Sequence, residues 1–195
     1  MRAGRMLGML GLLTAIALSA PAVLAEKAKG VLVGQAAPNF TLPVLNGQKG
    51  DWSLSSASGK IVVINFDSTQ CPVAKAYRDR YTKLVEKYGD KVTFVAINSN
   101  KTEPGDKISD EVSKWNHPVM KDDGAKVADT FGAKVTPHIY VVDAAGKIAY
   151  IGAIDDSQKE DKASKKYLDD AIGALLAGKE VPVSSTDAKG CTIKR

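Results

Sequence analysis

The stretch that decides the fold is KIVVINFDSTQCPVAKAYRDRY, residues 60–81. It opens with a near-continuous apolar and β-branched run, residues 60–68, which is typical of a strand buried on both faces. Apolar residues then recur at spacings of three and four, which predicts a helix from Pro72 to Tyr88. Proline suits the first turn, where an N–H has no partner within the helix, and Gly89 is a typical helix end.

Cys71 stands where this strand passes into this helix. Free N–H groups and the positive end of the helix dipole lower the pKa of a thiol there and make it nucleophilic. Lys75, one turn later on the same helix face, adds a positive charge. The alternative is an inert small residue at a helix start. In a C-x-x-C motif the second cysteine would be at position 74, and Ala74 is there instead.

Length and composition indicate one soluble globular domain. The chain has 195 residues, of which 44% are hydrophobic and 25% charged. The net charge of +5 falls to +3 without Arg2 and Arg5. Because the charges are mixed along the chain, with no dense basic cluster, we expect no nucleic-acid partner.

Residues 1–25 have the pattern of a cleaved signal peptide. Two arginines precede an apolar run, residues 7–20, that is too short for a comfortable membrane span, and small residues follow. We expect cleavage after Ala25, with Ala22 as the second choice, and a periplasmic or secreted protein without stable membrane insertion. An uncleaved membrane anchor is the alternative.

Export changes the meaning of the two cysteines, Cys71 and Cys191, because disulfides persist outside the cytoplasm. Two cysteines allow only one intramolecular pairing. Cys191 is then a structural partner, a resolving thiol or a free thiol. We favour a reversible bond with Cys71. In the chain-entropy model, closing so long a loop stabilises the fold by roughly 4–5 kcal/mol.

The rest of the chain predicts alternating strands and helices. The expected elements are a hairpin (34–60), a strand (91–100), two short helices (around 107–115 and 122–132), a second hairpin (133–155), an amphipathic helix (164–179) and a flexible polar tail (181–195). This order predicts a three-layer α/β/α sandwich with a central mixed sheet and an N-terminal β-hairpin extension.

This order and three motifs together resemble the thioredoxin superfamily, and in particular its redoxin branch of peroxiredoxins and exported thioredoxin-like proteins. The motifs are GQAAPNFTLPVLNG (34–47), INFDSTQCP (64–72) and VTPHIYVVDAAGKIAYIG (135–152). The resemblance covers a domain of residues 34–180. The final GCTIKR (190–195) is similar to the ending of a peroxiredoxin-like subgroup that pairs a CPVA site with a late cysteine.

The resemblance implies roles for several residues. The Thr136–Pro137 peptide bond would be cis and face Cys71, and the backbone of Thr136 would pair with a bound peptide or thiol. Ser68 matches the hydroxyl residue that peroxiredoxins place three residues before their cysteine, and it would tune the pKa of the thiol. His138, which follows on the predicted strand, is a candidate from its position alone: it would lie near Cys71 and tune the pKa of the thiol or donate a proton, and a solvated histidine or one at the edge of the core is the equal alternative.

The chain also departs from the peroxiredoxin pattern. Ile64 stands where peroxiredoxins have a proline, and no arginine lies between Arg80 and Arg195. The constellation that activates peroxide is therefore incomplete in this sequence.

Three functions remain open. The first is an exported thiol-disulfide oxidoreductase in which Cys71 attacks and Cys191 resolves, acting on a thiol or disulfide protein or a small thiol and restored by an unidentified reductant. The second is a thiol peroxidase, in which Cys71 forms a sulfenic acid that condenses with Cys191. The third is a non-enzymatic binding or structural module locked by one disulfide, or, with both thiols reduced, a module that binds Cu(I) through Cys71, Cys191 and His138. The first two need no cofactor or metal.

Overall fold

The computed structural model describes residues 1, 30–47 and 50–195. The predicted signal peptide and its cleavage site therefore lie outside the described residues. Within the described part, no helix is both long and apolar enough to cross a membrane.

The described secondary structure begins with a hairpin and then alternates strands and helices. Its elements are β1 (Thr41–Pro43), β2 (Asp51–Ser53), β3 (Ile61–Phe66), α1 (Pro72–Tyr88), β4 (Val92–Asn98), α2 (Gly105–Val112), β5 (Val119–Lys121), α3 (Lys126–Phe131), β6 (Val135–Thr136), β7 (His138–Val142), β8 (Ile148–Gly152), α4 (Tyr167–Leu176) and β9 (Cys191–Thr192). Short 3-10 turns lie at Leu54–Ala57, Asp123–Ala125 and Glu160–Lys162.

The central sheet has five strands in the order β5-β4-β3-β7-β8. The pairs β3–β4 and β4–β5 are parallel, whereas β7 runs antiparallel to both β3 and β8. The sheet is therefore mixed, as the order of the predicted elements requires. The β1–β2 hairpin forms a separate two-stranded sheet.

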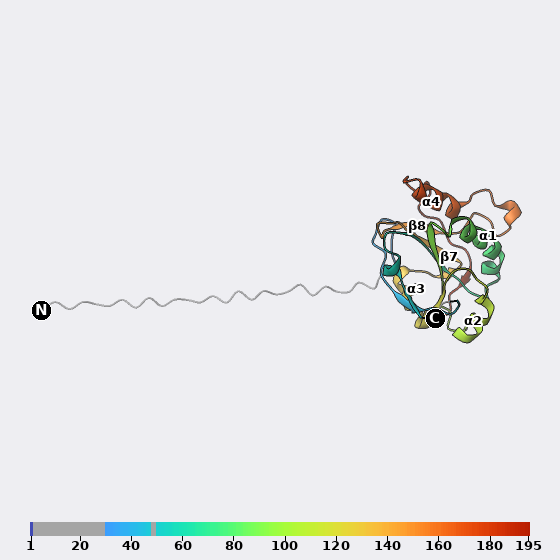
Figure 1. Ribbon diagram of the computed structural model, residues 1–195, viewed down its shortest axis with the longest axis horizontal. Coiled ribbons are helices and arrows are strands. Elements are labelled where there is room, and N and C mark those ends of the chain that lie inside the picture. Colours follow the sequence, from blue (N-terminus) through green and yellow to red (C-terminus); the bar gives the residue numbers. More distant parts are fainter. Residues whose placement is uncertain (2–29, 48–49) are drawn as a thin grey trace.

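Strand β3 lies at the centre of the sheet, and all six of its residues are buried. Ile61 and Val63 pack in a cluster that includes the buried sides of α1 and α4. Val62, Ile64 and Phe66 pack in a second cluster with α3 and the N-terminal segment. Helices thus cover both faces of the sheet, which gives the predicted three-layer sandwich (Figure 1).

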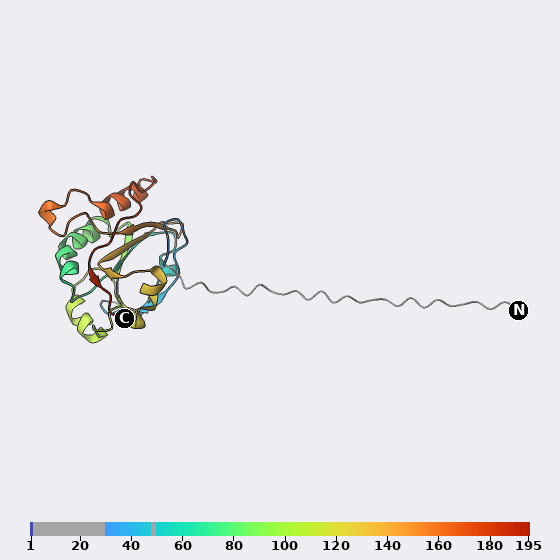
Figure 2. The same cartoon turned by 180° about the vertical axis from the view of Figure 1, so that it is seen from behind.

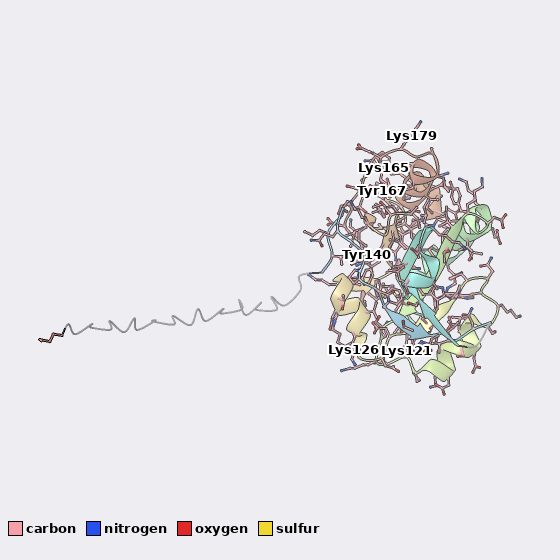
Figure 3. The ribbon with its side chains drawn as sticks, turned by 60° about the vertical axis from the view of Figure 1, so that its left-hand side comes forward. Lys121, Lys126, Tyr140, Lys165, Tyr167 and Lys179 are labelled. Carbon is pink, nitrogen blue, oxygen red and sulfur yellow. A yellow bond between two sulfur atoms is a disulfide. The ribbon has the colours of Figure 1, made fainter. Side chains whose placement is uncertain are left out.

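Charged side chains are spread over the domain, in agreement with the mixed charges of the sequence. Figure 3 shows Lys165 and Lys179 at one end of the domain and Lys126 at the other, with the buried Tyr140 between them. Lys121 is itself buried, and its Nζ donates to the carbonyl oxygen of Asn100 over 2.7 Å. The lysines labelled in the figure do not gather into one patch.

Helix α1 has the predicted bounds. Cys71 is its N-cap residue, Pro72 is at its first position and Gly89 is its C-cap. Lys87 in the last turn complements the negative end of the helix dipole.

Several predicted elements differ in extent, and two of the differences bear on the site. Helix α4 runs from Tyr167 to Leu176 instead of 164–179, and the N–H groups of Ser164 and Lys165 before it donate to the Asp156 carboxylate. The predicted hairpin 133–155 is interrupted at Pro137, which has no N–H to donate to a ladder. The two residues before it form β6, which pairs with β9 and not with the central sheet.

The C-terminal tail is docked, contrary to the flexible extension expected from its polar composition. It runs back from α4 across the domain and ends near α3 (Figure 2). Ile193 is only 2% exposed and packs in the same cluster as Phe66, Phe131 and Tyr140. One buried isoleucine and the β6–β9 pairing therefore make the tail part of the fold.

We predict that Ile193→Ala lowers the free energy of unfolding by about 2–4 kcal/mol, because it leaves a cavity in the core. Urea unfolding under reducing conditions measures this without a contribution from the disulfide. Lys194→Ala is the matched control, since this side chain is exposed. Equal effects of the two variants would show that the tail is not packed in solution.

Candidate redox site at the start of α1

Cys71 and Cys191 form a disulfide between the start of α1 and the tail. The bond joins residues 120 positions apart, whose Cα atoms are 5.9 Å from each other, within the usual range for a disulfide. The predicted pairing is therefore present in the structure.

The strand and helix around Cys71 place its sulfur at a helix N-terminus. Cys71 follows the carboxyl end of β3, the edge at which open α/β sheets commonly bind ligands. The Ala74 N–H of the first turn lies 3.4 Å from the Cys71 Sγ and donates to it. Because that donor and the helix dipole favour negative charge, they favour a thiolate at Cys71 once the disulfide is reduced.

The Thr136–Pro137 peptide bond is cis, as the resemblance implied. The carbonyl oxygen of Thr136 lies 3.1 Å from the Cys71 Sγ. Thr136 is paired with Cys191 in the antiparallel β6–β9 ladder. The backbone position that the resemblance gives to a bound partner is thus filled by the chain's own tail.

Ser68 holds the loop that carries Cys71. Its Oγ accepts the Cys71 N–H over 3.1 Å and donates to Glu103 over 2.5 Å. The Glu103 carboxylate also accepts from the backbone and side chain of Thr69 and from the Asn98 amide, at 2.7–2.8 Å. One buried carboxylate therefore ties two residues of the cysteine loop to the end of β4.

These hydrogen bonds also set the charge of Glu103. Burial raises the pKa of its carboxyl group, but the bonds from Ser68, Thr69 and Asn98 together outweigh burial and hold the pKa below its ordinary value. Glu103 is therefore ionised at neutral pH and accepts from all of its donors at once.

Asp67 has the opposite character, although it begins the same loop. Burial raises the pKa of its carboxyl group to about 6, against the lowering effect of the hydrogen bond from the Ser68 N–H. The loop thus holds one carboxyl group that stays ionised and one that takes up a proton in mildly acidic conditions.

Ser68 is hydrogen-bonded to Cys71, but His138 and Lys75, also predicted to tune the pKa of the thiol, are not. Burial, aided by Lys134, lowers the pKa of His138 to about 4, so its ring is neutral at pH 7. The ring packs on Tyr140 with centroids 4.8 Å apart. Lys75 is exposed. Within the described residues no hydrogen bond joins either side chain to Cys71, and their tuning roles stay predictions.

The sequence analysis missed Glu103 and Gly190. Glu103 sits in a polar loop 32 positions after Cys71, and no spacing connects the two. Gly190 precedes Cys191 directly, and a Cβ atom there would overlap the carbonyl group of Thr136. In a sequence, a glycine next to a cysteine is only a weak signal that two backbones approach closely. The docked tail explains why glycine is needed at this position.

Comparisons with known proteins agree with this geometry. A family model described as the AhpC/TSA family matches residues 33–151. The chain is 30% identical over 142 residues to the thioredoxin-like protein YneN of Bacillus subtilis (strain 168), covering 70% of this chain and 82% of YneN. It is also 30% identical over 125 residues to the thiol-disulfide oxidoreductase ResA of Bacillus thuringiensis (strain Al Hakam), covering 64% of this chain and 70% of ResA.

A solved structure is also similar. An uncharacterized conserved protein from Geobacillus kaustophilus superposes with a TM-score of 0.78 and 28% identity, over 84% of this chain and 92% of that one.

A mixed sheet between helices, with a cysteine at the strand-to-helix turn beside a cis-proline, defines a protein of thioredoxin-like fold. The chain belongs to the AhpC/TSA family, whose model matches more than half of its length. The predicted resemblance to the redoxin branch is thereby confirmed.

We predict that Gly190→Ala slows formation of the Cys71–Cys191 bond, because the added methyl group pushes the tail away from Thr136. Titration of free thiols during oxidation by diamide measures the rate. Thr192→Ala, an exposed change on the same strand, is the control and should oxidise like the wild type. Unchanged oxidation of Gly190→Ala would contradict the close approach.

We also predict that the stability advantage of Asp67→Asn over the wild type grows as the pH rises from about 4 to about 6. The folded protein keeps the Asp67 proton up to about pH 6, whereas the unfolded chain releases it near 3.8. Wild-type stability therefore falls through this window, by roughly 3 kcal/mol, and the variant lacks this loss. Urea unfolding from pH 4 to 8 measures the difference. A difference independent of pH would refute the raised pKa.

Proposed function

We propose that this chain is a thiol-disulfide oxidoreductase in which Cys71 is the nucleophile and Cys191 the resolving cysteine. The observation that carries the proposal is the disulfide between a cysteine at a helix N-terminus and a cysteine on a tail strand beside the cis-proline. The family membership and the name of ResA support the reaction class.

The reaction balances in two exchanges. The Cys71 thiolate attacks one sulfur of a substrate disulfide, forms a mixed disulfide with it and releases the other substrate sulfur as a thiolate. The Cys191 thiolate then attacks the Cys71 sulfur and releases the second substrate thiolate. The substrate gains two electrons, and the chain is left with the Cys71–Cys191 bond seen in the structure.

The contacts of the site fit these steps. The Ala74 N–H and the helix dipole favour the Cys71 thiolate before the first exchange. Because β9 is paired with β6, Cys191 is held beside Cys71, and the second exchange does not wait for a distant tail to find its partner. The substrate is a disulfide of a protein or small molecule, and a separate thiol reductant restores the pair.

We further propose that the chain works outside the cytoplasm, as a domain of residues 34–180 with its tail, after cleavage following Ala25. The N-terminal sequence pattern supports export. A disulfide between the chain's two cysteines fits a compartment where such bonds persist.

Reaction of the reduced protein with glutathione disulfide tests the proposed roles. We predict that the wild type releases two glutathione thiols per chain and forms the internal bond, whereas Cys191→Ser stops with one glutathione bound at Cys71. Cys71→Ser should react slower by about tenfold or more, because it lacks the activated thiolate. Mass spectrometry of quenched samples identifies each product. Glutathione captured equally well by Cys71→Ser would contradict the assignment.

The same variants separate the oxidoreductase from a peroxidase. Arg78 and Arg80 of α1 pair with Glu111 and Asp155, and Ile64 stands where peroxiredoxins have a proline. We therefore expect hydrogen peroxide to oxidise Cys71 of Cys191→Ser more slowly than glutathione disulfide does at equal concentration. Faster formation of a sulfenic acid would instead favour the peroxidase.

A further inference from the structure

The tail is bound to the rest of the domain both before and after Cys191 in the sequence. Before Cys191, the Thr186 N–H donates to the carbonyl oxygen of Ile151 over 3.0 Å. After it, the Ile193 N–H donates to Lys134 over 2.9 Å, and the Ile193 side chain is buried. These contacts do not involve sulfur, so the tail is held by more than the disulfide.

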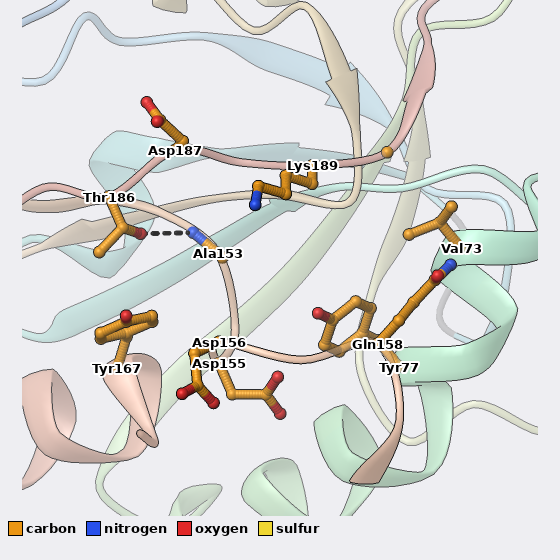
Figure 4. A pocket seen from close by; sticks show the side chains of 11 residues that line it. Val73, Tyr77, Ala153, Asp155, Asp156, Gln158, Tyr167, Thr186, Asp187 and Lys189 are labelled. Atoms are coloured by element: carbon orange, nitrogen blue, oxygen red, sulfur yellow. Dashed lines mark hydrogen bonds between the residues drawn. The ribbon is translucent and has the colours of Figure 1, made fainter. Parts of the chain in front are cut away.

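A cavity of about 370 Å³ lies beside the tail, between it and α1 (Figure 4). Its walls come from α1, from the loop after β8, from the start of α4 and from the tail. The two cysteines do not line it themselves, but its lining includes Val73, two residues after Cys71, and Gly190, the residue before Cys191. Its volume is at the small end of the range of ligand pockets, which suits a small molecule.

The two sulfur-bearing residues differ in accessibility. Cys71 is 3% exposed, beneath the first turn of α1 and the carbonyl group of Thr136. Cys191 is half-buried. An attacking thiolate must reach the sulfur that it attacks, so access favours Cys191 over Cys71.

The quality of the leaving group also favours attack on Cys191. Attack on one sulfur of a disulfide expels the other as a thiolate, and a thiolate of lower pKa leaves faster. Expelled from Cys191, Cys71 becomes a thiolate at a helix N-terminus with the Ala74 N–H directed to its sulfur. Cys191 lies on a short strand without a helix dipole. Attack on Cys191 therefore releases the better leaving group.

We infer that the oxidised protein is restored by a small-molecule thiol that enters through this cavity and attacks the Sγ of Cys191, not that of Cys71. This inference rests on the proposed function. It concerns the step that reduces the Cys71–Cys191 bond again, and it assigns the Cys191 sulfur as the atom attacked in that step. The thiolate RS⁻ forms RS–S–Cys191 as the Cys71–Cys191 bond breaks and Cys71 leaves as a thiolate. A second RS⁻ attacks the RS sulfur, releases RS–SR and frees the Cys191 thiolate. Two thiols are oxidised, and the protein disulfide is reduced.

The first test maps the mixed disulfide. Oxidised wild-type protein is treated briefly with excess 2-mercaptoethanol, quenched with acid, alkylated and analysed by peptide mass spectrometry. We expect the adduct on Cys191 and the alkyl group on Cys71, in about tenfold or greater excess over the reverse pattern. The reverse pattern would overturn the inference and leave the proposed function intact. A bond that no thiol reduces would overturn both.

The second test concerns the route. Val73→Trp fills part of the cavity, and we expect it to slow reduction by 2-mercaptoethanol about tenfold. Ala76→Trp is the matched control, since Ala76 is an exposed residue of the same helix and does not line the cavity. Equal reduction rates for the two variants would show that the thiol enters elsewhere.

The third test concerns the class of reductant and needs only the wild-type protein. It compares N-acetylcysteine methylamide with an unstructured ten-residue peptide that carries one cysteine at its centre. The two thiols have similar chemistry, so a difference in rate reports access. We expect the small thiol to react about tenfold faster or more. Equal rates, or a faster peptide, would replace the small molecule with a polypeptide partner.

Discussion

The site depends on the contact between a two-residue strand of the tail and the loop that contains the cis-proline. In that contact β9 lies antiparallel to β6, with Cys191 opposite Thr136. The backbones approach so closely that position 190 has no room for a side chain. This contact brings together the two cysteines, which the chain separates by 120 positions. It also covers the backbone edge to which the resemblance would bring a substrate, so chemistry and access are set by the same few residues.

A second constraint is the turn between β3 and α1. The helix start favours a negative sulfur, but it does so only if the loop before it has a fixed course. The Glu103 carboxylate provides that course through Ser68 and Thr69, at the cost of a second buried acid close to Asp67. Burial keeps Asp67 partly protonated in mildly acidic conditions. Under those conditions Asp67 and Glu103 are therefore not both fully charged. Burial, aided by Lys134, keeps the ring of His138 neutral at pH 7.

Much of the fold was predictable because its signals are local. The apolar run of β3 and the apolar spacing of α1 gave the bounds of α1 and the burial of β3 correctly. The mixed sheet followed from the order of strands and helices. The prediction for the tail was wrong, because its polar composition hides one buried residue, Ile193. A single apolar side chain has no periodicity, so nothing in the tail's own sequence distinguishes a docked segment from a mobile one.

By itself, the sequence determined that Cys71 begins a helix after a buried strand, and that Cys191 is the only cysteine with which it can pair within the chain. Both follow from residue type and spacing along the chain. Only the tertiary structure decided that the tail pairs with β6, that Glu103 holds the cysteine loop, and that Cys191 is the more accessible of the two cysteines. The physical reason is that these features are contacts between segments far apart in sequence. They depend on which backbone edge is free and how much space each side chain leaves, and no local pattern contains that information.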